Sequence, residues 1–592
     1  MRVRTPHRAV RRRVTAVVAA LVTASVLTAC QGSSAKSDAQ DPAKGGTLNV
    51  VLSAGPISNL DPQEISLATD ANISHIINRT LTTVTSSGTL MPDLATDLGR
   101  PDATRQTWDF TLKPNLKWQD GSPLTCQDVQ YGIERRFASS ISQIGGLPYP
   151  MQYLADSADY TGPFLGQNLS SIVCLDTHNI EFHLLRPAGD FGYTVSVSTF
   201  APMKASADTD HRNDGSSKST DYDPFSDGPY QVDPTQTKIG SYVADQQTLY
   251  YASQLVLVRN KYWNPATDPA RKAYPDKIVI QYDDQRTQVT NDLIQSATPF
   301  YRNAVSLDSD VTPNYVQQVV NDPTLSKRAI SGIVGATRYF AINTINLPNK
   351  TCRQALEYGI DKRAWRYAAG GAIFGDLATG VIPPNLKAFS GNDIYHTNDN
   401  PDGDPNQAEQ DWQHANCPKS ITAAYPDTSV YKQLMATVVT AYARANIVVT
   451  PVPISTEAYY QSIGDPHNSY DIVLAGWIPD WPNGSGVIPD LFESAEVTAA
   501  KQDPVHNALG NYNYSQETDG TMQSMITQAF ATDDLNEQYH LWAQLDDYQM
   551  QQAYTIPILF NKGLRMAGTN VRGGVMSPAW GEPDLSVLGV AS

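Results

Sequence analysis

Hydrophobic residues recur at every second position in several short segments of the chain. In residues 46–52 and 107–113 they alternate with polar ones, which predicts β-strands with one buried face. Uninterrupted apolar runs at 255–258 and 278–280 predict strands that are buried on both faces. Gly55-Pro56 ends the first segment, as is typical of a strand that leads into a turn.

Helical patterns lie between the predicted strands. Thr125 and Asp128 form a capping box at the start of a helix that continues to Ala138, and a further helix is expected at 70–80. From about residue 331 the alternation starts again, with strands expected at 338–343, 446–452 and 471–475 and helices at 352–367, 430–445 and 521–552. This alternation predicts α/β lobes.

The first thirty residues predict export and lipidation. Six Arg and no acidic residue precede an apolar run at 14–27, which is too short to cross a bilayer and is typical of a secretory signal. The run ends in Leu27-Thr28-Ala29-Cys30, which resembles a bacterial lipobox whose Cys accepts a lipid. We therefore expect a signal peptide at 1–29, a lipid on Cys30 and a polar tether at 30–45. The alternatives are an ordinary cleaved signal and a twin-arginine signal at residues 11–12.

The rest of the chain is strongly acidic. Removing residues 1–29 takes away six Arg and moves the formal charge from -17 to -23. Nucleic acid and anionic lipid headgroups would repel such a protein, so we expect no nucleic-acid partner and membrane contact through the lipid alone. After residue 29, no stretch approaches the eighteen consecutive apolar residues of a transmembrane helix.

Four cysteines follow Cys30, namely Cys126, Cys174, Cys352 and Cys417. An even number in an exported protein indicates disulfides rather than metal ligands, and free buried thiols are the alternative. Of the three possible pairings, the sequential one is favoured because it keeps each bridge inside one expected domain. It would join the first turn of the helix after Thr125 to the start of a strand at 180–184.

Sequence signatures of catalysis are absent. The chain has no G-x-S-x-G, G-x-G-x-x-G, P-loop, H-E-x-x-H or C-x-x-C motif, so we expect neither an enzyme nor a cofactor or metal site. Residues 398–409 have the ligand spacing of a calcium-binding loop. They begin with Asn rather than Asp, and Pro401 and Pro405 interrupt them. An acidic surface turn is therefore the favoured interpretation.

The segment 470–484 holds the best candidate for ligand binding. An apolar strand leads into a loop with Trp477, Asp480 and Trp481. A carboxylate between aromatic rings suits an ammonium group, through charge pairing and cation–π attraction. The alternative is that both Trp pack the loop and that Asp480 is a turn residue.

The motifs resemble those of the family 5 extracellular solute-binding proteins, which serve peptide, nickel and opine ABC transporters. The most specific match is 108–125, where a strand, a basic residue and an aromatic residue precede D-G-x-P-L-T and a helix. Weaker matches lie at 60–62, 228–230, 259–263, 353–362 and 404–408, in the same order along the chain as in the family. The resemblance covers roughly residues 46–565.

The resemblance implies a periplasmic-binding-protein-like α/β fold of class II, of the large peptide-binding type. Two lobes would be joined by a two-stranded hinge and close on the ligand, with an extra subdomain on lobe I. The expected domains are 46–85 for lobe I, 86–215 for the extra subdomain, 216–330 for lobe I again, 331–550 for lobe II, and 551–592 for the return to lobe I.

The resemblance also implies a site. In peptide-binding members, an Asp two or three residues after a Gly-Trp pair anchors the α-ammonium group of the ligand, and Asp480 matches it. Pro479 and Pro482 depart from the pattern of the family. The expected ligand-binding residues are Asp480, Trp477, Trp481, Asn343 and Asn59. No Arg or Lys lies near Asp480 in the sequence to hold a ligand carboxylate, which leaves open a longer peptide, an amine-bearing metabolite or a neutral glycan.

The expected function is therefore that of the solute-binding component of an ABC importer. The protein would be a monomer, lipid-anchored at the outer face of the cytoplasmic membrane, and would deliver peptides or peptide-like solutes to a permease. The alternatives are an enzyme or sensor on the same scaffold, or a binder of oligosaccharides or metal chelates.

Overall fold

The computed structural model describes residues 42–142, 145–208, 223–244, 247–456, 458–502 and 511–591. The chain divides into two compact units, residues 1–40 and 41–592, and all described residues belong to the second. The signal peptide predicted at 1–29, Cys30 and most of the predicted tether lie outside the described residues.

The sheet of lobe I contains the first strand of the fold. Its order is β12-β1-β11-β10-β8, with β9 paired to β10; the bounds are β1 Thr47–Leu52, β8 Tyr230–Val232, β9 Lys238–Ala244, β10 Gln247–Arg259, β11 Lys277–Tyr282 and β12 Ala304–Ser306. β1 runs parallel to β11 and β12, and β10 is antiparallel to β11. The strands predicted at 46–52, 255–258 and 278–280 are confirmed.

Helices cover one face of this sheet. Val51 of β1 packs with α6 (Arg286–Gln295), α8 (Pro313–Asn321) and α9 (Pro323–Ser326). On the other face, Val50 and Leu52 pack against α1 (Ala68–His75). The shorter elements are α7 Pro299–Arg302, β2 Thr82–Val84, β3 Leu90–Pro92, β19 Val571–Arg572 and β20 Gly589–Val590.

The extra subdomain has its own sheet and core. The sheet order is β4-β5-β7-β6, with bounds β4 Arg100–Pro101, β5 Thr107–Thr111, β6 Ile172–Cys174 and β7 Asn179–His183. Trp108 and Phe110, the apolar positions of the alternating segment, point into the core. The short helices are α3 Ser139–Ser142, α4 Tyr149–Tyr153 and α5 Phe191–Thr194.

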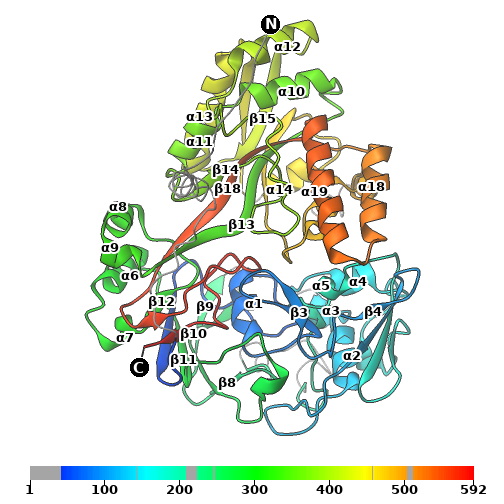
Figure 1. The fold of residues 1–592 in the computed structure, drawn as a ribbon, viewed down its shortest axis with the longest axis vertical. Helices are drawn as coiled ribbons and strands as arrows, with labels where there is room; N and C mark the ends of the chain where they lie inside the picture. The colour runs from blue at the N-terminus through cyan, green and yellow to red at the C-terminus, as the bar shows by residue number, and fades with distance from the viewer. Residues whose placement is uncertain are drawn as a thin grey trace, which may run out of the picture. The chain divides into compact units, whose positions relative to one another are not determined.

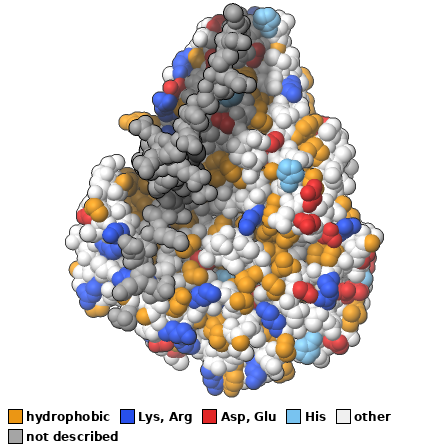
Figure 2. All heavy atoms as spheres, viewed as in Figure 1, with side chains coloured by type: hydrophobic (Ala, Val, Ile, Leu, Met, Phe, Trp, Pro, Cys, Tyr) orange, Lys and Arg blue, Asp and Glu red, His pale blue; other side chains and the backbone are white. Residues whose placement is uncertain are grey.

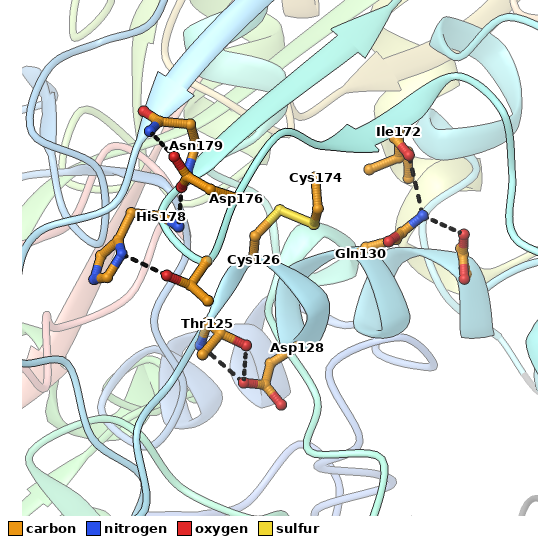
Figure 3. The surroundings of a disulfide bond; sticks show 11 residues. Thr125, Cys126, Asp128, Gln130, Ile172, Cys174, Asp176, His178 and Asn179 are labelled. Carbon is orange, nitrogen blue, oxygen red and sulfur yellow. Dashed lines mark hydrogen bonds between the residues drawn. A yellow bond between two sulfur atoms is a disulfide. The ribbon is translucent and has the colours of Figure 1, made fainter.

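A disulfide ties the helix of this subdomain to its sheet (Figure 3). α2 (Cys126–Arg135) begins after Thr125, whose backbone N–H donates to Asp128 at 2.8 Å, so the predicted capping box is present. Cys126 and Cys174 are bonded with a Cα–Cα distance of 5.8 Å. Cys174 ends β6 rather than starting the following strand, because residues 175–178 turn the chain back into β7.

Lobe II is built on a second, mixed sheet. Its order is β14-β18-β13-β17-β15-β16, with bounds β13 Ala329–Ile342, β14 Gly375–Leu377, β15 Ser420–Pro426, β16 Val448–Ile454, β17 Ile472–Trp477 and β18 Thr555–Met566. Phe340 and Ile342 pack on one face, against α10 (Lys350–Gly359), α11 (Lys362–Ala368), α12 (Pro405–His414) and α13 (Ser429–Ala443). Tyr339 and Ala341 pack on the other, against α14 (Tyr459–Gly464), α15 (Ile488–Phe492), α18 (Gly520–Phe530) and α19 (Leu535–Gln552).

Two of the helices predicted in lobe II are interrupted. The helix expected at 521–552 is split into α18 and α19, because Asp534 caps a new helix by accepting the backbone N–H groups of Asn536 and Glu537. The helix expected at 352–367 is split at Ile360, whose backbone is extended. α16 (Ser494–Gln502) is a further helix of lobe II.

Two long strands connect the lobes. β13 and β18 pair antiparallel along most of their lengths and run from the sheet of lobe II toward β12 (Figure 1). Leu564 and Met566 of β18 pack in the core of lobe I, whereas Ile556 and Ile558 pack in lobe II. A bulge interrupts the pairing between Ile333 and Thr337. The domain boundaries expected from the sequence stay predictions.

The second disulfide lies in lobe II, where Cys352 of α10 is bonded to Cys417. With the first bridge, this is the sequential pairing that the sequence favours. The cysteines are separated by 65 residues and pack with Trp365 and Trp412 in one core.

Replacing both Cys352 and Cys417 by Ala should lower the free energy of unfolding of lobe II by roughly 3–4 kcal/mol, because the unfolded chain regains the freedom of a long loop. Urea denaturation followed by tryptophan fluorescence measures this loss. A reductant opens the Cys126–Cys174 bridge as well, so reduced wild-type protein should be destabilised at least as much as the double variant. An unchanged urea midpoint in the double variant would contradict the prediction.

Candidate functional site

A cavity of about 250 Å³ lies between lobe I and the loop that follows β17. Its walls come from α1 and the residues before it, from β2, and from the loop segments 196–201, 478–480 and 579–580. The lining thus includes residues of both lobes and of the extra subdomain. A cavity that joins such distant segments is the usual place for a ligand in a two-lobed protein.

Asp480 supplies the only acidic side chain among the described residues that line this cavity. Asp480 lines the cavity and is exposed, and the hydroxyl of Tyr149 from α4 donates a hydrogen bond to its carboxylate. Burial raises the pKa of Asp480 above its ordinary value, and the hydrogen bond from Tyr149 partly opposes that rise. The carboxylate therefore lacks a countercharge and would be stabilised by a cation.

The loop that carries Asp480 is fixed by hydrogen bonds on both sides of it. Trp477 at the end of β17 donates from Nε1 to the carbonyl oxygen of Gly486 at 2.7 Å. Trp481 donates from Nε1 to the hydroxyl of Ser485 at 2.8 Å. A side chain at Gly484 would collide with Trp542 of α19, so the loop packs directly on that helix.

Trp481 inserts into the extra subdomain of lobe I. It is 2% exposed, belongs to the core of that subdomain, and contacts Tyr149 edge to face with ring centroids 4.8 Å apart. Beside it, Asp190 of the subdomain accepts hydrogen bonds from Asn483, at 2.8 Å, and from Ser485. These contacts hold the loop of lobe II against lobe I, and burial raises the pKa of Asp190.

On the opposite side, His75 and Trp580 line the cavity. Their rings are 4.6 Å apart. Burial lowers the pKa of His75 well below its ordinary value, and the neighbouring guanidinium of Arg271 lowers it further. Because Arg271 Nη2 lies 3.3 Å from Nδ1 of His75, this nitrogen accepts a hydrogen bond and the imidazole is neutral.

Of the five expected ligand-binding residues, only Asp480 lines the cavity. Trp477 packs against Tyr512 with tilted rings whose centroids are 5.0 Å apart, and Trp481 is enclosed by the core. Asn343 accepts the backbone N–H groups of Ile345 and Asn346. Asn59 accepts that of Asp61 at 2.7 Å and donates to Glu64. Ligand contacts for these four residues stay predictions.

The sequence did not point to Tyr149, His75 or Trp580. They come from the extra subdomain, α1 and the last segment of the chain, and no motif distinguishes them from other aromatic residues. Only the tertiary structure brings His75 and Trp580 to the cavity that Asp480 lines, and Tyr149 to the carboxylate of Asp480.

The segment with calcium-loop spacing folds as the start of a helix. Asp404 caps α12 by accepting the backbone N–H groups of Asn406 at 3.1 Å and Gln407 at 3.0 Å, and Pro405 is the first helical residue. Within the described ranges, no group of three or more His, Cys, Asp or Glu side chains is placed to hold a metal ion.

The described surface is mixed in charge. On the face in Figure 2, basic side chains are scattered among acidic, hydrophobic and neutral ones. Among the helices that the structure describes, none combines the length and the apolar character needed to cross a bilayer.

Comparison with known proteins identifies a family. Residues 89–498 match the sequence model described as "Bacterial extracellular solute-binding proteins, family 5 Middle". The chain is 21% identical to the "Probable D,D-dipeptide-binding periplasmic protein DdpA" of Escherichia coli (strain K12), over 82% of each chain. It is 22% identical to the dipeptide-binding protein of the same organism, over 89% of this chain and 92% of the relative.

The fold has close structural neighbours. The solved structure of clavulanic acid biosynthesis oligopeptide binding protein 2 superposes with a TM-score of 0.79 at 25% identity, over 94% of this chain and 98% of that one. The two-lobed α/β fold predicted from the sequence is confirmed.

Changing Tyr149 to Phe should raise the pKa of Asp480, because the hydrogen bond that favours the ionised carboxylate is lost while burial is kept. The measurement is a pH titration of ¹³Cγ-labelled aspartate by NMR, with the Asp480 signal assigned from its loss in Asp480→Asn.

Tyr153→Phe is the matched control, because Tyr153 lies in the same helix and the groups that shift its pKa do not include Asp480. It should leave the titration of Asp480 unchanged. The prediction fails if Tyr149→Phe titrates as the wild type does.

Proposed function

The chain belongs to the bacterial extracellular solute-binding proteins of family 5, and we propose that it captures peptides or peptide-like amines for an ABC importer. In this proposal the ligand is held between the lobes and delivered unchanged to the permease. The names of the two relatives and of the structural neighbour described above all refer to peptide binding, which supports this ligand class.

The position of Asp480 is the observation that carries the proposal. Its carboxylate faces the cavity and receives a hydrogen bond from Tyr149 but has no cationic partner among the lining residues that the structure describes. An α-ammonium group would supply the missing charge and donate up to three hydrogen bonds. The ring of Trp580 also lines the cavity and could add cation–π attraction.

Closure on the ligand would follow from the two connecting strands. A ligand that contacts Asp480 on lobe II and α1 on lobe I interacts with both lobes only when they are close together, so it favours the closed state. The bulge between Ile333 and Thr337 interrupts the ladder of β13 and β18 and is the proposed hinge.

Membrane attachment is part of the proposal. A lipid on Cys30 would hold the protein at the outer face of the cytoplasmic membrane, with residues 30–45 as the tether and the protein as a monomer. The basic and apolar segments at the start of the chain and the lipobox-like sequence support this location.

Asp480→Asn should weaken the binding of amine-bearing peptides by roughly 10–100-fold, because a hydrogen bond to a charged group contributes about 1.5–3 kcal/mol. Isothermal titration calorimetry with a pool of dipeptides that carry a free amine measures the change.

Asp427→Asn removes an acidic side chain that is 41% exposed and pairs with Lys432 outside the cavity. This control should bind as the wild type does. Equal affinities in Asp480→Asn and Asp427→Asn would overturn the role of Asp480.

Gly335→Ala should disturb closure. Gly335 lies in the bulge with φ of +77°, and a Cβ would have room there, 3.5 Å from the nearest atom. The substitution therefore costs about 1–2 kcal/mol through the left-handed backbone alone. We expect it to change the ligand-dependent decrease in the radius of gyration in X-ray scattering.

Gly166→Ala is the matched control, since Gly166 also has φ of +77° and open space around it but lies in the extra subdomain. It should lose a similar amount of stability and keep the scattering response. The bulge is not the hinge if both variants close as the wild type does.

A further inference from the structure

The described lining of the cavity carries negative charge but no Lys or Arg. Asp480 is acidic, and no Lys or Arg is found among the described residues that line the cavity. Arg136 lies behind Leu147, where its guanidinium donates to the carbonyl oxygens of Gly146 and Leu147. An ammonium group would therefore have a partner of opposite charge in the described walls, whereas a carboxylate would have none.

His75 cannot supply the missing positive charge. Its Nδ1 faces the guanidinium of Arg271, and a proton on that nitrogen would oppose a charge 3.3 Å away. Arg271 is itself buried, and it donates to Asp93 at 2.9 Å and to Asp268 at 3.2 Å. Its charge is therefore already balanced below the cavity wall.

The remaining polar groups of the lining are neutral. Ser74, Asn78, Thr80 and Thr83 lie on the side of lobe I, and Ile478, which is 56% exposed, lies on the side of lobe II. Hydroxyl and amide groups can pair with peptide or amide groups of a ligand. They do not neutralise a carboxylate, which in a confined space requires a positive partner.

The volume of the cavity determines whether both ends of a ligand contact this lining. The cavity volume of about 250 Å³ falls just below the usual range of small-molecule pockets, which is roughly 300–1,000 Å³. A ligand of the size of a dipeptide would place both of its ends inside. Its carboxylate would then lie without a counterion in the same cavity as Asp480, where like charges repel.

We propose that the cavity selects ligands that carry an amine but no carboxylate, such as C-terminally amidated dipeptides or small amines with a neutral amide body. This inference rests on the proposed function and specifies its ligand class. Asp480 would hold the amine, the neutral lining would pair with amide groups, and the carbon skeleton would pack on Trp580 and Ile478.

Three pools of dipeptides with the same side chains test this proposal. One has a free amine and a free acid, the second a free amine and a C-terminal amide, and the third an acetylated amine and the amide. Each pool is added at equal concentration to the full-length protein, and native mass spectrometry measures bound ligand. We expect the amide pool to bind at least about tenfold more than the acid pool, and the acetylated pool to bind least.

Asp480→Asn supplies the second comparison. Removing its negative charge should weaken binding of the amide pool and bring the acid and amide pools closer together. Equal or stronger binding of the acid pool to the wild type would overturn the inference and leave the proposed function standing. If no pool binds, the proposed function fails with the inference.

Discussion

The hydroxyl of Tyr149 meets the carboxylate of Asp480 across the two lobes, and the site depends on this contact. It joins the extra subdomain of lobe I to the loop after β17 of lobe II. One hydroxyl satisfies part of the hydrogen-bonding capacity of the carboxylate but leaves its negative charge without a Lys or Arg partner among the described residues of the cavity lining. A ligand cation can complete the pairing, so the same residue can favour both ligand binding and closure of the lobes.

Rigid surroundings keep that carboxylate in place. Trp481 is enclosed in the core of the extra subdomain, and Asp190 accepts hydrogen bonds from Asn483 and Ser485. On the other side of the cavity, Arg271 is held by Asp93 and Asp268, and it keeps His75 neutral. The charge of Asp480 on the cavity wall therefore lacks a positive partner in the described lining, whereas the charge of Arg271 behind His75 is balanced.

Local patterns in the sequence predicted most of the secondary structure. Alternation at 107–113 and the capping box of Thr125 and Asp128 depend on nearby residues, and both are present in the structure. The break at Asp534 was missed because apolar residues recur at helical spacing on both sides of it, although a helix-capping Asp is the signal that could have located it.

The site was predictable only in part. The Gly-Trp pair before Asp480 is a local motif, and the structure places that carboxylate on a cavity. Tyr149 is 331 residues away from Asp480, and neither its spacing nor its neighbours mark it. Trp481 has the residue type of a ligand contact, but long-range packing encloses it. Interactions that form only when distant segments fold together leave no pattern in the sequence.

A crystal structure of the protein with an amidated dipeptide bound tests the central claim most directly. The measured quantity is the distance from the amine nitrogen of the ligand to the carboxylate of Asp480. We expect a separation of about 2.7–2.9 Å, typical of a charge-assisted hydrogen bond, with the amide end among neutral side chains. A ligand whose amine lies elsewhere, or a bound peptide whose carboxylate pairs with a Lys or Arg in the cavity, would contradict it.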